Sequence, residues 1–116
     1  MKNDINSPQI EIDRMIHEPA RLLIMVHLAV VREADFRYLL YKTKLSRGNL
    51  SVQLQKLEAA GYIRIEKQFI KRIPRTVAKL TKLGRTALDQ YKSEIVELLS
   101  SAEESLEPAD DLQEKT

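Results

Sequence analysis

Residues 45–61 read LSRGNLSVQLQKLEAAG. The apolar residues of this stretch recur at helical spacing, at Leu50, Leu54 and Leu57. Ser46 is a residue type that caps helix N-termini, and Gly61 is one that ends helices. We therefore predict a helix over residues 47–60 that buries its leucine face.

A second helix is predicted just before this one, over residues 36–43. Asp35 can cap it, and Phe36, Leu39 and Leu40 fall on one of its faces. About three residues separate the two helices. Two helices joined by so short a turn are typical of a helix-turn-helix.

A further helix is predicted ahead of this pair, over residues 19–31. Pro19 stands at its first position, which proline favours, and apolar residues recur along it at helical spacing. We expect its buried stripe to join the same core.

Beyond Gly61 the apolar period changes from helical to alternating. Ile63, Ile65 and Phe69 fall on one face of a predicted strand, and we expect Phe69 in the core. A basic tip over residues 71–74 leads to a second strand over residues 75–80. The pattern predicts a β-hairpin with a cationic tip.

The last predicted helix runs over residues 82–106, after the capping residue Thr81. It would be roughly 37 Å long at 1.5 Å per residue, which is more than so small a core can cover. Its apolar seam has coiled-coil spacing, so the expected partner is the same helix of a second subunit. The predicted dimer interface consists of Leu88, Tyr91, Ile95, Leu98 and Ala102.

The composition is that of one folded domain. The chain has 116 residues, of which 43% are hydrophobic and 31% charged. No apolar run approaches a membrane span, no signal peptide precedes the first helix, and the lack of Cys fits the cytosol. We divide the chain into a flexible N-terminus (1–9), a helix-turn-helix domain (10–92), the outer half of the last helix (93–107) and an acidic disordered tail (108–116).

The charge is divided unevenly along the chain. Residues 36–92 carry 14 basic and 3 acidic residues, a balance of +11, although the whole chain carries +2. Residues 93–116 carry 1 basic and 8 acidic residues. The basic block indicates a polyanionic partner, with a solvated basic face as the alternative.

The order helix, helix, helix, strand, strand, helix, with a basic third helix and a basic hairpin, resembles the winged helix-turn-helix of MarR and ArsR regulators. The likeness is closest to small prokaryotic winged-helix transcriptional regulators. It is carried by Asp13, Ile16, His17, Pro19, Arg21, Leu22, Ile24, Met25, residues 45–51, Leu54, residues 56–58, Gly61, Tyr62, Lys67, Phe69, residues 74–76, Leu80, Thr81, Gly84, Ala87 and Leu88.

The resemblance implies a mainly α fold with a small β-hairpin (α+β), the wing, and a long C-terminal dimerisation helix. It also implies a DNA-binding regulator of transcription. Lys44 and Lys71 stand where such proteins often have Gly. Either lysine therefore has to adopt a positive φ, or the turns differ.

The residues opposite the leucine face of the third helix suit a DNA major groove, because Arg, Asn, Gln and Ser are side chains that bond base edges and phosphates. These candidate DNA-binding residues are Ser46, Arg47, Gly48, Asn49, Ser51, Gln55 and Lys56. On the wing the candidates are Lys67, Lys71, Arg72 and Arg75, with Lys42 and Lys44 as auxiliary phosphate contacts. The alternatives are solvated helix surface and charge that protects a strand edge.

The leading hypothesis is a homodimeric, sequence-specific transcriptional regulator, a repressor by default, that binds an approximately palindromic operator. A winged-helix module that docks an acidic protein is the alternative. A small-molecule effector between the first and last helices is a third option, supported by fold analogy alone.

Catalysis and metal binding are not expected. The chain has no Cys, and His17 and His27 lack companion ligands. Gly48, Gly61 and Gly84 are scattered and form no phosphate loop. We therefore predict neither an enzyme nor a cofactor.

Overall fold

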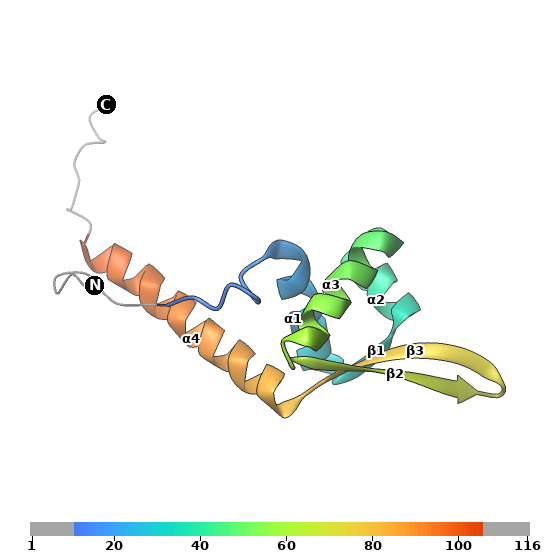
Figure 1. Ribbon diagram of the computed structural model, residues 1–116. Coiled ribbons are helices and arrows are strands. Elements are labelled where there is room, and N and C mark those ends of the chain that lie inside the picture. Colours follow the sequence, from blue (N-terminus) through green and yellow to red (C-terminus); the bar gives the residue numbers. More distant parts are fainter. Residues whose placement is uncertain (1–10, 106–116) are drawn as a thin grey trace.

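A computed structural model describes residues 11–105 (Figure 1). Its elements follow the predicted order with one addition. They are α1 (Pro19–Val31), β1 (Glu33–Asp35), α2 (Phe36–Thr43), α3 (Arg47–Ala59), β2 (Ile63–Ile70), β3 (Ile73–Leu80) and α4 (Lys82–Ser105). The predicted fold class, mainly α with a small sheet and a long C-terminal helix, is confirmed. The predicted flexible N-terminus (1–9) and acidic tail (108–116) lie outside the described residues.

The predicted caps and turns explain where the helices begin and end. The side chains of Asp35, Ser46 and Thr81 accept hydrogen bonds from backbone N–H groups in the first turns of α2, α3 and α4, at 2.8, 3.1 and 2.9 Å. Gly61 follows α3 with a φ of 83°. A Cβ at Gly84 would lie 2.1 Å from the carbonyl oxygen of Tyr62, so the close approach of α4 to the start of β2 requires glycine there.

The sheet has three antiparallel strands in the order β1-β3-β2. The hairpin β2–β3 was predicted, but β1 was not. Its three residues pair with β3 so that Ala34 lies opposite Ala78 and is buried. So short a strand carries no periodic signal, and it forms because β3, far along the chain, offers an open edge.

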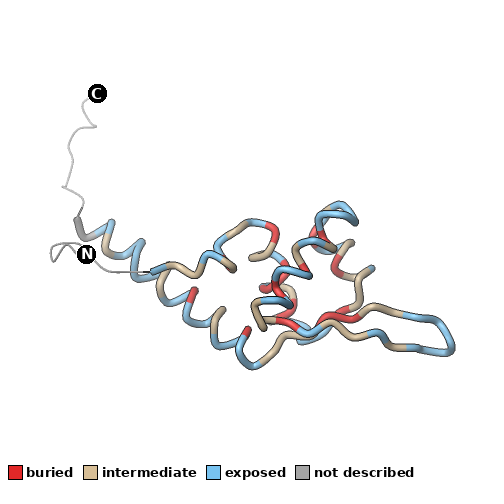
Figure 2. Tube along the Cα trace, viewed as in Figure 1, coloured by how far each residue is buried: buried red, intermediate tan, exposed pale blue. Residues whose placement is uncertain are grey.

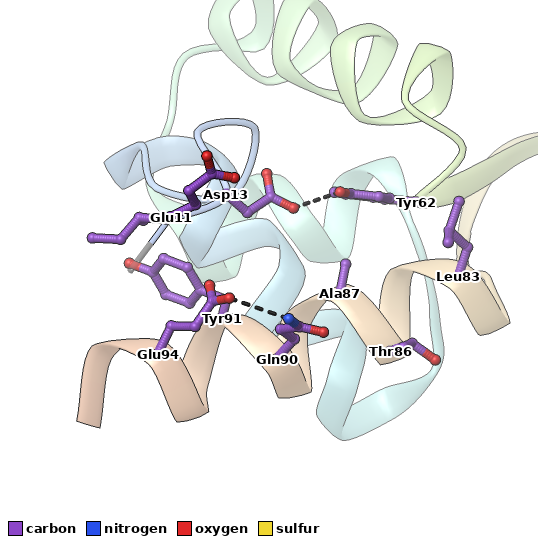
Figure 3. A pocket seen from close by; sticks show the side chains of 10 residues that line it. Glu11, Asp13, Tyr62, Leu83, Thr86, Ala87, Gln90, Tyr91 and Glu94 are labelled. Carbon is purple, nitrogen blue, oxygen red and sulfur yellow. Dashed lines mark hydrogen bonds between the residues drawn. The ribbon is translucent and has the colours of Figure 1, made fainter. Parts of the chain in front are cut away.

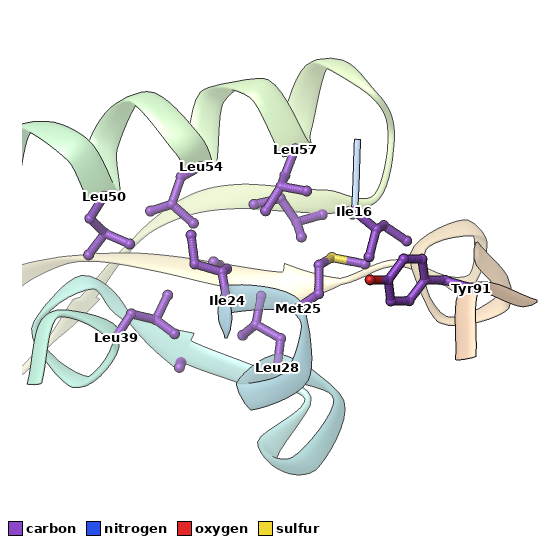
Figure 4. Close-up of a cluster of buried hydrophobic side chains, with 12 residues drawn as sticks. Ile16, Ile24, Met25, Leu28, Leu39, Leu50, Leu54, Leu57 and Tyr91 are labelled. Atoms are coloured by element: carbon purple, nitrogen blue, oxygen red, sulfur yellow. The ribbon is translucent and has the colours of Figure 1, made fainter. Parts of the chain in front are cut away.

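The core lies between α3 and the pair α1 and α2, with the sheet beside it (Figures 2 and 4). All three leucines of α3 point into it, as their spacing predicted. Its fully buried side chains are Ile16, Ile24, Met25, Leu28, Leu39, Leu50 and Leu57. The core therefore holds α3 by one face and leaves its opposite face exposed.

Helix α4 extends away from the rest of the protein towards its C-terminal end (Figure 1). It packs on the core through Ala87, Leu88 and Tyr91 of its first half and through Ile95, just beyond the midpoint. Its outer half is largely exposed, and its 24 residues span about 36 Å.

The hairpin also reaches beyond the core, and here one prediction is wrong. Phe69 was expected in the core, yet it is 72% exposed. It does lie on the same face of β2 as Ile63 and Ile65, because side chains alternate along a strand. Core packing ends at Ile65, however, so strand periodicity identified the face and not the limit of its burial.

Candidate nucleic-acid interface

The exposed face of α3 carries the predicted polar residues. Arg47, Gly48, Asn49, Gln55 and Lys56 are exposed there, as is the cap Ser46, whereas Ser51 is half-buried. Gly48 has open space around the position of a Cβ. The N-terminus of α3 can thus approach a flat or concave partner closely, with uncompensated N–H groups that favour anions.

Aromatic side chains of α2 lie beneath the cations around this N-terminus. The guanidinium carbon of Arg47 is 5.9 Å from the ring centre of Phe36, and Lys44 Nζ is 4.7 Å from that of Tyr41. Lys42 Nζ lies 5.7 Å from the ring centre of Tyr38. Lys44 has a φ of 62°, so of the two alternatives, a positive φ or a different turn, the first holds at this lysine. The structure therefore gathers Lys42, Lys44 and Arg47 at one end of α2 and α3.

The hairpin tip is a two-residue turn formed by Lys71 and Arg72. Both have positive φ, 53° and 68°, the backbone that a tight hairpin turn needs and that glycine or asparagine usually supplies. Both side chains are exposed, as is that of Lys67. The flanking Ile70 and Ile73 pair across the strands and are exposed too, so the tip is cationic with an apolar base.

The fourth wing candidate, Arg75, is only partly exposed and is bound within the protein, so its contact with DNA stays a prediction. Its Nη1 donates to Asp35 Oδ2 at 2.5 Å, and its side chain is half-buried. Asp35 is also the cap of α2. The backbone hydrogen bond from Tyr38 and, after it, Arg75 hold the pKa of Asp35 below its ordinary value, against the opposing effect of burial. Arg75 therefore joins β3 to α2.

Sequence reasoning missed a chain of polar contacts behind α3. Arg21 Nη1 donates to Gln53 Oε1 at 2.7 Å, and Gln53 Nε2 donates to Asn49 Oδ1 at 2.9 Å. The spacing of Asn49 and Gln53, four residues apart on one helix, could have revealed their contact. No signal in the sequence joins Arg21 to Gln53, which are 32 residues apart.

The segment before α1 contacts two residues that are distant in the sequence, Tyr62 before β2 and Tyr91 on α4. Tyr62 Oη donates to Asp13 Oδ2 at 2.5 Å, and burial, then Asp13, raises the pKa of Tyr62 to about 12. His17 Nδ1 lies 2.8 Å from Tyr91 Oη. Tyr91 is 8% exposed within the single chain and packs in the core, and it also lines the groove between α1 and α4, so its predicted place in a dimer seam stays a prediction.

Depressions lie on both sides of the first half of α4. An open pocket of about 390 Å³ between α4 and the segment before α1 is lined by Glu11, Asp13, Tyr62 and Glu94, among others (Figure 3). A mainly apolar groove of about 530 Å³ lies between α1 and α4 and includes Leu22, Val26, Leu88, Ile95 and Val96. Val30, which also lines the groove, is 77% exposed.

Two features are absent from the described part of the chain. None of its helices is both long enough and apolar enough to cross a membrane. In residues 11–105 no three His, Asp or Glu side chains gather as a metal-binding group.

These observations, a two-helix motif with an exposed polar face beside a cationic hairpin, agree with the comparison with known families. Residues 20–99 match the winged helix DNA-binding domain family. The chain belongs to this family. The wing is the β2–β3 hairpin, and α3 is the second helix of the helix-turn-helix.

Individual relatives support the assignment. An uncharacterized protein of Methanocaldococcus jannaschii is 33% identical over 90 residues, which cover 78% of this chain and 98% of that protein. The structure of a transcriptional regulator homologue from Pyrococcus horikoshii superposes with a TM-score of 0.73 at 28% identity, covering 78% of this chain and 89% of the other.

A MarR-family transcriptional regulator from Silicibacter pomeroyi has a TM-score of 0.59 at 17% identity, covering 81% of this chain and 62% of the other, a likeness of fold alone. The predicted resemblance in fold to MarR-like winged-helix proteins is thus confirmed.

Proposed function

We propose that this winged-helix protein is a homodimeric transcriptional regulator that binds duplex DNA sequence-specifically, with α3 in the major groove. The observation that carries the proposal is the exposed face of α3, where Arg47, Asn49 and Gln55 stand beside the cationic wing. Arg bonds guanine O6 and N7, and amide side chains bond base edges, so this face can read sequence. The proposal involves no catalytic step and no cofactor.

Phosphate contacts would position α3 in the groove. Ser46, Gly48 and Ser51 lie near or at the N-terminus of α3, where backbone N–H groups favour phosphate. Lys56 lies further along the helix, and Lys42 and Lys44 flank its start. Such contacts fix register without carrying sequence information.

The wing would contact the DNA beside the major groove. Lys67, Lys71 and Arg72 reach solvent from one protruding hairpin, which suits flanking phosphates or a narrow minor groove. Arg75, whose Nη1 is bound to Asp35, is not counted among these contacts.

A second copy would cover the apolar surface of α1 and α4. Val96 and Leu99 are 56% and 62% exposed, and Leu98 and Ala102 are exposed on the same outer half of the helix. This surface continues into the groove that Leu88 and Ile95 line. To seat two copies of α3 in successive major grooves of an approximately palindromic operator, the symmetric dimer that buries this surface has to hold them about 34 to 36 Å apart.

Repression follows as the default mode, because a dimer seated on an operator blocks polymerase without any further surface.

Selection of genomic fragments by the purified protein, followed by sequencing, tests the proposal. We expect an enriched palindromic site. With about eight phosphate contacts, the logarithm of affinity should fall against the logarithm of salt concentration with a slope near −7. Salt-independent binding to duplex DNA would contradict the proposal, and a co-purifying acidic protein without DNA affinity would favour a docking module instead.

A small-molecule effector is a second proposal, and the pocket between α4 and the segment before α1 favours it. Glu11, Asp13 and Glu94 give the pocket carboxylates, and Tyr62 and Tyr91 give it aromatic walls. These groups suit a cationic aromatic compound. Organic amines of this class should raise the thermal midpoint of the protein, and no change across such a series would remove the support.

A further inference from the structure

The contacts from Arg21 to Asn49 determine which atoms Asn49 can offer to a base. Arg21, on α1, has a side chain that is 12% exposed, and Gln53 is half-buried. Asn49 is exposed, in the first turn of α3. The contacts of 2.7 and 2.9 Å therefore run from the interior to the face that the proposed function places on DNA.

The chemistry of the donors sets the direction of every bond in this series. A guanidinium group can donate hydrogen bonds and cannot accept them. The atom of Gln53 that faces Arg21 must therefore be its oxygen, and the atom that faces Asn49 must be its NH₂ group. Because that group only donates, Asn49 must turn its own oxygen towards Gln53. The amide orientations thus follow from the arginine and not from the placement of O and N atoms alone.

Arg21 is itself held in place, so it cannot readily release Gln53. Its Nε donates to the carbonyl oxygen of Met15 at 2.6 Å, and its Nη2 donates to that of Arg14 at 3.4 Å. Glu18 Oε1 lies 3.9 Å from its Nη1. The segment before α1 therefore fixes the guanidinium that orients the amides of α3.

We infer that Arg21 and Gln53 hold Asn49 with its NH₂ group towards the major groove, so that Asn49 selects a base with hydrogen-bond acceptors. The inference rests on the proposed function. Gln53 occupies one of the two lone pairs of the Asn49 oxygen, so the outward contact that does not compete with Gln53 is donation from the NH₂ group, to adenine N7 among other acceptors. Guanine, with O6 and N7, and thymine, with O4, meet an outward donor, whereas cytosine presents its N4 donor to it. Arg21 and Gln53 are positioning residues, and Asn49 is the specificity-determining one.

The substitution Gln53→Glu tests the inference by reversing the direction of the hydrogen bond between residues 53 and 49. A glutamate pairs with Arg21 and presents its second carboxylate oxygen to residue 49, so the amide of Asn49 turns its NH₂ group inwards and its oxygen outwards. The full-length protein and its variants are measured in competition against the selected operator with each of the four bases at each half-site position. The added negative charge weakens all duplexes alike, so the ratios between bases are the readout.

For the unsubstituted protein we expect one position per half-site at which guanine or thymine is preferred over cytosine by about five-fold or more, from a discrimination of roughly 1 kcal/mol or more. Asn49→Ala should abolish this preference. Gln53→Glu should reverse it in favour of cytosine. Arg47→Ala is the matched control, because it should change a different position.

The outcomes separate the inference from the proposed function. An unsubstituted protein with no sequence preference would overturn both. A protein that selects an operator but keeps the same preference in Gln53→Glu, or in which Asn49→Ala changes no position, would overturn the inference alone. If Gln53→Glu does not fold, as shown by the loss of its thermal unfolding transition, Gln53→Leu is measured instead. Leucine frees the amide of Asn49, so the preference for guanine or thymine over cytosine should narrow to about two-fold. An unchanged preference in Gln53→Leu would overturn the inference.

Discussion

Arg75 Nη1 lies 2.5 Å from Asp35 Oδ2, so a cation that the sequence places on the wing binds the cap of α2 instead. The contact links β3 to the helix-turn-helix and sets the wing relative to α3. Partly exposed ion pairs contribute little individually, but this one also supports a helix cap.

Replacing Arg75 by methionine should therefore affect stability more than DNA charge contacts. Methionine keeps the length of the apolar stem and removes the ion pair. We expect the free energy of unfolding to fall by about 1 kcal/mol, measured by denaturant titration. The salt slope of DNA binding should stay unchanged, and a slope that drops as it does for a phosphate contact would return Arg75 to the interface.

Arg72→Ala, by contrast, should weaken DNA binding and leave stability unchanged. Its side chain is exposed at the wing tip, so we expect unchanged stability and weaker binding to specific and random duplexes alike. The salt slope should become shallower by about two for the dimer, from about 0.9 per contact in each protomer. Selective loss of one operator base would show instead that Arg72 reads sequence.

The wing turn offers a test of backbone strain. The double substitution Lys71→Asn with Arg72→Gly places at both positive-φ positions residues that tolerate this backbone. We expect a gain of about 0.5–1 kcal/mol and a rise of several degrees in Tm, measured by calorimetry, together with weaker DNA binding. The single change Lys71→Ala is the control, since it removes one charge and retains the strain; equal Tm values for the two variants would contradict the argument.

Tyr62 should make stability depend on alkaline pH. Its pKa is raised from 10.0 to about 12 in the folded protein, so the folded state keeps this proton while the unfolded state loses it. The contribution of Tyr62 to the free energy of unfolding is fully present below pH 10 and is lost as the pH rises from 10 to about 12. Tyr62→Phe should flatten this decline when its denaturant midpoints are compared with those of the unsubstituted protein at each pH. Parallel declines would rule out Tyr62 as the cause.

Charge on the outer half of α4 should dissociate the proposed dimer. We expect Val96→Glu with Leu99→Glu to sediment as a monomer and to bind the operator at least about 100-fold more weakly, because the second half-site contact is lost. Glu97→Lys is the control, since helical geometry places Glu97 on a different face from the apolar stripe. A dimeric double variant would locate the interface elsewhere.

Local patterns in the chain were sufficient for the helices, the hairpin and the caps. Asp35, Ser46 and Thr81 act on backbone groups within three residues, so their roles are local. The cationic tip and the polar face of α3 also follow from spacing, because helix and strand geometry distribute neighbouring residues over known faces.

Contacts between distant segments were beyond such reasoning. The strand β1 needs the edge of β3, Arg75 finds Asp35 40 residues away, and Tyr91 reaches His17 across 74 residues. Phe69 continues the face of Ile63, but whether a helix covers that part of the strand depends on where α2 and α3 lie.

The amino-acid sequence alone thus determined the order of elements and the presence of a basic, polar reading face, since both depend on interactions between near neighbours. Tertiary structure alone decided which cations remain available to DNA and which way the amide of Asn49 points. Those two properties depend on partners that folding brings within about 3 Å, Asp35 for Arg75 and Arg21 for Gln53. Hydrogen bonds act over such short distances that no pattern of residue types reveals them before the chain is packed.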